Sequence, residues 1–231
     1  MQSTKAADEP ALPVTAIGRG WTPLRALIVS LLLAILGAAA LGIDLPVERW
    51  FIAGHEGGAI KKVLDLDEVF GHGAGVAVIL LAVLVLAPDL RQKLPRVMAS
   101  AYLSGLVAIS MKLFLARSRP NATQFDSIHG VLDTFGAWFP WFSTKSAWQS
   151  FVSGHTATAV GLALGLSWLL PRGKWLFAAL AVLVGFQRMA GAHHYPSDVL
   201  WGAAIGCLVG SACLPGGWLS PPFDWLERRA Q

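Results

Sequence analysis

Long apolar segments dominate this chain of 231 residues and restrict what it can fold into. Only 14% of the residues are charged, whereas a soluble domain carries roughly 25%. The aliphatic residues come in blocks of about twenty, the length that a helix needs to cross a bilayer. We therefore predict an all-α fold, a bundle of six transmembrane helices at residues 23–43, 69–88, 97–117, 152–171, 174–192 and 198–216.

The segments outside these blocks define the predicted domain boundaries. Residues 1–22 are polar and contain two prolines, so we expect an N-terminal cytoplasmic tail there. A signal peptide is a weaker interpretation, because the first apolar block starts late and is long enough to remain as a true span. Residues 23–217 form the predicted membrane domain, and residues 218–231 a C-terminal cytoplasmic tail.

The distribution of lysine and arginine predicts the orientation. With six spans the two termini share one side, and that side carries ten basic residues against five on the other, the cluster cations described below set aside. By the positive-inside rule both termini are cytoplasmic. All six histidines then lie on the outer side. The net charge of +4 is scattered around the apolar blocks, so it does not indicate a nucleic-acid partner.

Two predicted outer loops are long. Residues 44–68 are rich in charges and are consistent with an amphipathic surface helix. Residues 118–151 contain a group of aromatic residues, Trp138, Phe139, Trp141, Phe142 and Trp148 among them. Aromatic rings at this level favour the headgroup layer. They serve either as an interface anchor or as a lip over which a lipid enters.

Three polar clusters interrupt the apolar pattern in a fixed order, each at the end of a predicted span on the outer side. They read Lys112-x6-Arg119-Pro120, then Ser153-Gly154-His155, then Arg188-x5-His194-x3-Asp198. Charges and imidazoles beside a bilayer are costly, so their accumulation indicates function. Each cluster alone also has a structural explanation: a snorkelling lysine, a capped helix start, or a carboxylate in a first helical turn.

The residue types in the clusters fit phosphate chemistry. Lys112 and Arg119 lie seven residues apart and point to one side if the helix continues that far. Ser153 is a good N-cap residue, and the helix N-terminus that follows it offers free N–H groups to an anion.

The third cluster contains a candidate nucleophile. If Asp198 accepts a hydrogen bond from one nitrogen of His194, the tautomer is fixed and the other nitrogen is left free to attack. The adjacent His193 is a competing candidate, and the spacing to Arg188 and Asp198 in the family pattern described next favours His194.

With these residues the chain resembles the type-2 phosphatidic-acid phosphatase superfamily, in particular its membrane lipid phosphatase branch. The pattern of that family is K-x6-R-P, then P-S-G-H, then S-R-x5-H-x3-D, and the resemblance covers residues 112–198. It implies a helical bundle whose active site faces the extracytoplasmic side. It also implies that residues 23–217 form a phosphatase domain that hydrolyses a lipid phosphate or pyrophosphate through a phosphohistidine.

The resemblance assigns five residues to the phosphate. Lys112, Arg119 and Arg188 would grip the phosphate oxygens, and Ser153 and Gly154 would stabilise the transition state with side-chain and backbone donors. Family members of this type need no metal or other cofactor, and the sequence offers no compact set of carboxylates to bind one.

Three further residues carry the implied reaction. His194 would attack phosphorus, Asp198 would orient His194, and His155 would protonate the departing alcohol. Two positions depart from the family pattern, since Val152 replaces its proline and Gln187 replaces its serine. Neither carries an assigned chemical role.

The implied partners are a lipid phosphate substrate and the bilayer. The composition, rich in alanine and leucine, and the compact loops favour a bacterial inner membrane, with the active site facing the periplasm or the exterior. Two alternatives remain open at this point. The same residues serve a phosphotransferase that passes the phosphate to another lipid, and a non-catalytic membrane protein with an anion site also contains cations. Neither the identity of the lipid nor the oligomeric state follows from the sequence.

Overall fold

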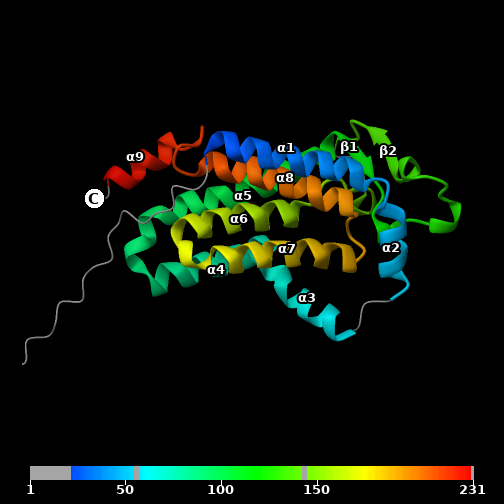
Figure 1. Ribbon diagram of the computed structural model, residues 1–231, viewed down its shortest axis with the longest axis horizontal. Helices are drawn as coiled ribbons and strands as arrows, with labels where there is room; N and C mark the ends of the chain where they lie inside the picture. Colours follow the sequence, from blue (N-terminus) through cyan, green and yellow to red (C-terminus); the bar gives the residue numbers. More distant parts are fainter. Residues whose placement is uncertain (1–21, 55–57, 142–144, 230–231) are drawn as a thin grey trace, which may run out of the picture.

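The computed structural model describes residues 22–54, 58–141 and 145–229 of the chain. Of the tail predicted at residues 1–22, positions 1–21 lie outside the described residues. Glu56 and Phe142 of the predicted outer loops also lie outside them. Within the described part, six long helices lie side by side (Figure 1): α1 (Pro23–Ala40), α4 (Gly73–Leu86), α5 (Leu94–Ser110), α6 (Gly154–Leu169), α7 (Lys174–Ala190) and α8 (Pro196–Cys213).

Shorter elements cover the two ends of this bundle. At one end lie α2 (Asp44–Ile52), α3 (Gly58–Gly71) and a hairpin of β1 (Leu115–Arg117) and β2 (Phe135–Trp138), and at the other end lies α9 (Pro221–Arg229). Short 3₁₀ helices connect the elements: η2 (Pro88–Lys93), η3 (Met111–Leu113), η4 (Pro120–Ala122), η5 (Phe125–Ser127), η6 (Val131–Thr134), η7 (Ser146–Trp148) and η8 (Pro171–Gly173). The predicted surface helix in residues 44–68 is thus two helices, α2 and α3.

Three of the described helical segments are long and apolar enough to cross a bilayer by themselves: Pro23–Ala40, Pro88–Leu113 and Pro196–Cys213. The other three predicted spans correspond to α4, α6 and α7, which are 14, 16 and 17 residues long. Most of α6 is buried among its neighbours, so it is the central helix of the bundle. The predicted helical bundle is therefore confirmed.

The end of the third predicted span differs from the prediction. The α5 helix ends at Ser110, and after one 3₁₀ turn the chain continues as strand β1, which pairs antiparallel with β2. The prediction that this span continues to residue 117 was wrong, so the condition for Lys112 and Arg119 to share a helix face is not met. The physical reason is that the backbone of residues 115–117 finds its hydrogen bonds in the hairpin, while Pro120 cannot continue a helix. The prediction of an all-α fold also did not include this two-stranded hairpin.

A seam of small residues lets three helices approach closely. The Ser100 hydroxyl in α5 donates to the carbonyl of Gly161 in α6 at 2.7 Å and lies 3.1 Å from the carbonyl oxygen of Gly210 in α8. A Cβ atom on Gly161 would lie 2.2 Å from the Ser100 carbonyl oxygen, so only glycine fits there. Close packing of this kind drives helix association where surrounding lipid removes the hydrophobic driving force.

The segment expected as a C-terminal tail contains a docked helix. Arg96 is fully buried and donates to Glu227 at 2.7 Å and to Asp224 at 2.6 Å, both in α9. Its guanidinium group also lies over the ring of Trp168, at 5.2 Å from the centroid. These contacts hold α9 against the end of the bundle that is remote from the polar clusters.

The seam predicts a measurable loss of stability on adding a single methyl group. We expect Gly161→Ala to lower the free energy of unfolding by about 1–3 kcal/mol, because a Cβ atom there overpacks the contact with Ser100. Gly130→Ala is the matched control, since a Cβ atom on Gly130 meets nothing within 4 Å. Thermal unfolding of both variants in the same detergent measures the difference. Equal melting temperatures would contradict the importance of the seam.

Candidate active site

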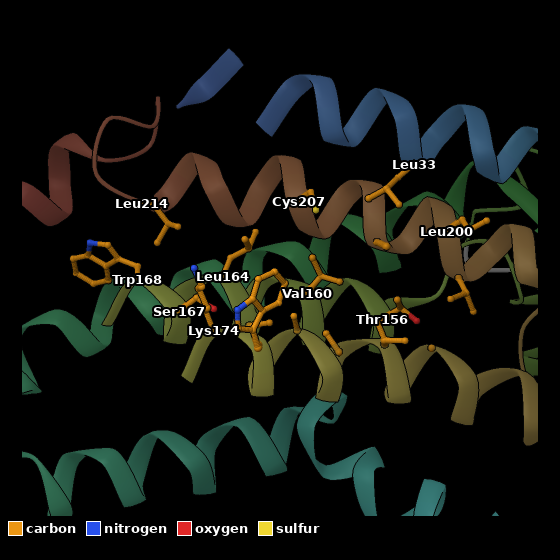
Figure 2. Close-up of a pocket in the computed structure, with 18 of the residues that line it drawn as sticks. Leu33, Thr156, Val160, Leu164, Ser167, Trp168, Lys174, Leu200, Cys207 and Leu214 are labelled. Carbon is orange, nitrogen blue, oxygen red and sulfur yellow. The ribbon is translucent and has the colours of Figure 1, made fainter. Parts of the chain in front are cut away.

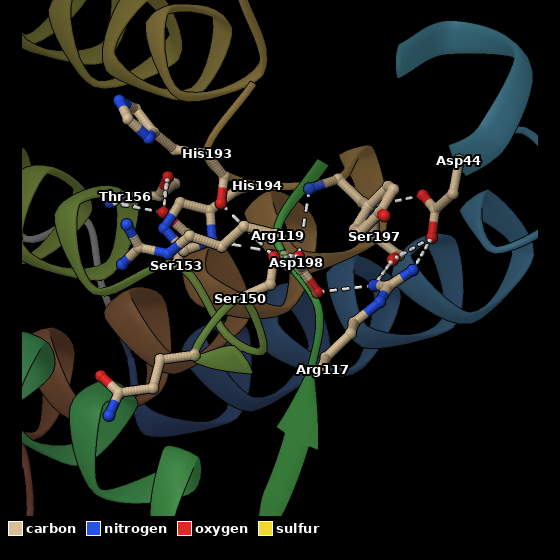
Figure 3. A network of polar contacts seen from close by, with 12 residues as sticks. Asp44, Arg117, Arg119, Ser150, Ser153, Thr156, His193, His194, Ser197 and Asp198 are labelled. Atoms are coloured by element: carbon tan, nitrogen blue, oxygen red, sulfur yellow. Dashed lines mark hydrogen bonds and ion pairs between the residues drawn. The ribbon is translucent and has the colours of Figure 1, made fainter. Parts of the chain in front are cut away.

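The third and first clusters meet through a buried network centred on Arg117 (Figure 3). The Arg117 guanidinium donates from Nη1 to Asp198 Oδ1 and from Nη2 to Asp44 Oδ2, both at 2.6 Å, and all three side chains are fully buried. Ser197 adds a hydrogen bond to Asp44 at 2.6 Å, and Thr134 accepts from Arg117 Nε at 3.1 Å. One arginine therefore joins β1, α2 and the start of α8.

Aromatic rings enclose the same guanidinium group. Its Cζ atom lies 4.5 Å from the ring centroid of Phe135 in β2 and 4.1 Å from that of Tyr195. The negative face of an aromatic ring attracts a cation, and this cation–π interaction is strongest where water is excluded. The hairpin thus contributes both the arginine and one wall of its pocket.

His194 lies beside the carboxylate that Arg117 holds. Its Nδ1 atom is 3.9 Å from Asp198 Oδ2, longer than a hydrogen bond, and its side chain is almost fully buried. Asp198 Oδ2 also accepts from the Ser150 hydroxyl at 2.6 Å and from the Tyr195 N–H at 3.1 Å. His193 turns away from this group in Figure 3 and is only half-buried. The geometry therefore pairs His194, not His193, with Asp198.

The surroundings keep His194 neutral. Burial lowers the pKa of His194 to about 4, and the charge of Lys112 acts in the same direction. The negative charge of Asp198 opposes this shift but does not outweigh it. Above this pKa the imidazole carries one proton, so one of its two nitrogens has a free lone pair. With Nδ1 facing Asp198, the nitrogen available to a ligand is Nε2.

The three cluster cations lie around His194. Lys112 donates to the Gln149 carbonyl at 2.6 Å. The next residue in the chain, Ser150, donates its hydroxyl hydrogen bond to Asp198. Burial and the positive charge of Arg188 lower the pKa of Arg119. Strand β1 and the 3₁₀ turns place Lys112 and Arg119 there, in place of the continuous helix that the spacing suggested.

The second cluster forms the start of α6, as its sequence indicated. Ser153 is the N-cap, and its hydroxyl accepts from the Thr156 N–H at 3.3 Å. The Ser153 N–H in turn donates to the Asp198 carbonyl at 3.1 Å, so the starts of α6 and α8 are joined. Gly154 is buried and His155 follows in the first turn. Val152, which replaces the family proline, is fully buried, and the cap forms after it.

An acid that the sequence reasoning did not single out also lies in this cluster. Glu68, near the end of α3, accepts from Arg188 Nη1 at 2.7 Å. The same oxygen is 3.6 Å from His155 Nε2. The structure therefore brings a carboxylate to two of the predicted site residues.

Several nitrogens of the predicted residues are left without hydrogen bonds. Nε of Arg119, Nε of Arg188 and Nε2 of His155 are buried and have no hydrogen-bond partner among the described residues. Buried donors of this kind normally have partners. Three unpaired donors from three clusters at the same end of the bundle are what a site for a tetrahedral anion such as phosphate requires.

An apolar groove starts at this end and runs along the bundle between α7 and α8, with α6 as its floor (Figure 2). Its volume is about 1340 Å³. Thr156 lies at one end of it, and Trp168 and Leu214 lie at the other. Its lining also includes Met189 and Pro196, and these two residues and Thr156 are each within two residues of a cluster residue. Its lining is mostly aliphatic and aromatic.

Four polar residues of the site were missed by the sequence reasoning: Asp44, Glu68, Arg117 and Ser150. Arg117 carried a signal, since it is a charge at the end of an apolar run two residues before a cluster arginine, but it was counted only as a basic residue at the outer end of the third span. Asp44 and Glu68 gave no local signal. Asp44 meets its partner 73 residues along the chain and Glu68 meets its partner after 120.

Comparison with known proteins places this geometry in context. A curated lipid A 1-phosphatase from Rhizobium johnstonii is 38% identical over 104 residues, which is 45% of this chain and 39% of that relative. The undecaprenyl-diphosphatase BcrC of Bacillus subtilis is 31% identical over 61 residues, which is 26% of this chain and 32% of that relative. The chain thus matches well under half of the length of these relatives.

Two solved structures share the fold. The crystal structure of Aquifex aeolicus LpxE has a TM-score of 0.56 at 24% identity, and covers 74% of this chain and 94% of that one. The transmembrane PAP2 type phosphatidylglycerolphosphate phosphatase from Bacillus subtilis has a TM-score of 0.52 at 19% identity, and covers 88% of this chain and 96% of that one.

The family comparison covers the site itself. A family model described as the PAP2 superfamily matches residues 93–219, which is more than half of the chain and includes all three clusters. The site residues that meet at the end of the bundle all fall inside this range, apart from Asp44 and Glu68. The chain therefore belongs to the PAP2 superfamily.

Proposed function

We propose that this protein is an integral-membrane lipid phosphatase that works through a phosphohistidine intermediate. The observation that carries the proposal is the convergence of the three clusters: Lys112, Arg119 and Arg188 with His155 and His194 at one end of a bundle of apolar helices. Phosphoryl transfer needs positioning and charge neutralisation above all, and this constellation supplies both.

The proposed setting is a bacterial inner membrane crossed by six helices, with the active site on the extracytoplasmic side. The distribution of lysine and arginine supports this orientation. The exposed aromatic residues Trp138, Phe139 and Trp141 lie on the hairpin end, at the level expected for headgroups. The relatives named above are bacterial proteins.

In the first step Nε2 of His194 attacks phosphorus. A bond forms between this nitrogen and phosphorus while the bond from phosphorus to the lipid oxygen breaks. His155 donates its proton to the departing oxygen, so the lipid leaves as an alcohol or as a lipid phosphate. Lys112, Arg119 and Arg188 neutralise the charge on the phosphoryl oxygens during this transfer.

In the second step water attacks the phosphohistidine. His155, now neutral, takes a proton from the water, the bond from phosphorus to nitrogen breaks, and inorganic phosphate and free His194 result. The free N–H groups at the start of α6, behind Ser153 and Gly154, face the same anion. A phosphotransferase would use the same first step and replace water with an acceptor lipid.

Arg117 has a positioning role in this scheme. It holds Asp198 from the side opposite His194, and Asp44 holds Arg117 in turn. The carboxylate then cannot rotate away from the imidazole, and the charge that develops on His194 during attack finds a fixed counter-charge.

The apolar groove supports a substrate with a hydrocarbon chain. It starts beside the phosphate-binding residues and lies at the depth of the membrane-spanning helices. A chain attached to a phosphate in the site would therefore exchange contact with bulk lipid for contact with α6, α7 and α8. The relatives act on lipid A and on undecaprenyl diphosphate by name. We propose these two lipid classes as the first substrates to test.

His194→Ala should reduce phosphate release by at least about a thousandfold while the protein still folds, because the covalent catalyst is lost. Phosphate release from lipid A and undecaprenyl diphosphate in detergent measures the effect. His193→Ala is the matched control and should stay within about tenfold of wild type. A folded His194→Ala protein with near wild-type turnover would rule out the nucleophile assignment.

Arg117→Lys should lower kcat by about ten- to a hundredfold with little change in KM, because an ammonium group cannot bond Asp198 and Asp44 in the fork geometry of a guanidinium. Arg49→Lys is the control, since Arg49 is exposed and contacts Phe125 rather than the buried network. If KM rises and kcat is unchanged, Arg117 binds substrate directly and the positioning role is wrong.

Ala178→Trp should raise KM for a long-chain lipid phosphate by about tenfold and leave a short-chain phosphate unaffected, because the indole fills the groove far from the site. Leu176→Trp is the control, on the same helix but outside the groove lining. An equal loss on both substrates would show that the groove does not bind the chain.

A further inference from the structure

The carboxylate of Glu68 lies within the cluster of cationic residues of the site. Its Oε1 atom is 2.7 Å from Arg188 Nη1 and 3.6 Å from His155 Nε2. In the proposed reaction Arg188 binds a phosphoryl oxygen and His155 Nε2 protonates the leaving oxygen. One oxygen of Glu68 therefore lies where oxygens of the substrate have to be.

A bound phosphate and this carboxylate exclude each other. A phosphate monoester carries up to two negative charges, and like charges at contact distance within a partly buried site are strongly unfavourable. The Arg188 side chain is only 6% exposed, so little water is present to screen them. Substrate binding must therefore remove Glu68 from Arg188.

The structure shows how Glu68 can leave. Its side chain is 39% exposed, so it has an open path to solvent. The backbone of α3 is held in place, because a Cβ atom on Gly71 would lie 2.8 Å from the His155 carbonyl oxygen and 2.7 Å from Val184. The displacement is therefore a side-chain rotation about a fixed helix end, which is fast and reversible.

We propose that Glu68 is a displaceable carboxylate that competes with the phosphoryl group for Arg188 and His155, and that it thereby weakens phosphate binding and promotes release of inorganic phosphate. The competition keeps the cluster charge-compensated while the site is empty. The inference rests on the proposed function in that the competing ligand is a phosphoryl group.

The test measures anion binding directly, without turnover. Inorganic phosphate and vanadate are titrated by calorimetry into the full-length protein in detergent, and their inhibition constants for lipid phosphate hydrolysis are measured in parallel. The variants are Glu68→Gln, which removes the charge, and Glu68→Asp, which keeps the charge but is too short to reach Arg188. Asp67→Asn is the matched control, since it removes a charge one residue away on a different face of α3.

Glu68→Gln and Glu68→Asp should both bind phosphate about three- to tenfold more tightly than wild type, as expected for the loss of a half-exposed ion pair, while Asp67→Asn stays within about twofold. Unchanged or weaker binding in Glu68→Gln overturns the proposal. Tighter binding in Glu68→Gln with wild-type binding in Glu68→Asp also overturns it, because the charge would then act from a distance and not by contact.

A different role for Glu68 gives a different result. If it keeps His155 protonated, Glu68→Gln lowers kcat and moves the alkaline limb of the pH profile to lower pH without tightening phosphate binding, and the competition is refuted. Because binding is measured without turnover, tighter phosphate binding in a protein that hydrolyses none of the lipids tested would support the competition and reject the lipid phosphatase.

Discussion

The guanidinium group of Arg117 lies fully buried between the carboxylates of Asp44 and Asp198, and one end of the bundle is built around it. Burying three charged groups is costly, and the pairing only offsets that cost when every hydrogen bond is made. Here Arg117 bonds both acids at 2.6 Å and lies against two aromatic rings. The network thus fixes α2, the hairpin and the start of α8 relative to one another.

The packing of the helices explains why the clusters meet. The glycine and serine seam brings α5, α6 and α8 close together, and the Ser153 N–H joins the start of α6 to the Asp198 carbonyl. Three chain segments that carry polar clusters therefore end at the same level. Charged side chains beside a bilayer are unfavourable in free energy. Ion pairs between them, and the hairpin that covers them, offset this cost.

Two acids near the histidines differ in burial, and this difference separates their roles. Asp198 is fully buried and receives hydrogen bonds from Arg117, Ser150 and a backbone N–H, so its position is fixed. Glu68 is half-exposed and contacts Arg188 and His155. A fixed carboxylate suits the orientation of an imidazole, whereas an exposed one can exchange with a ligand.

The sequence by itself determined the apolar helices, the capped start of α6 and the positions of the three polar clusters along the chain. Each of these follows from a local pattern, namely the length of an apolar block, an N-cap serine, or residues at a fixed short spacing. It did not determine how Lys112 and Arg119 come together, since strand β1 replaces the expected helix by pairing with β2, a strand that lies later in the chain. Only the tertiary structure placed Asp44 on Arg117 and Glu68 on Arg188, because each contact joins segments more than seventy residues apart and no local periodicity records such a pairing.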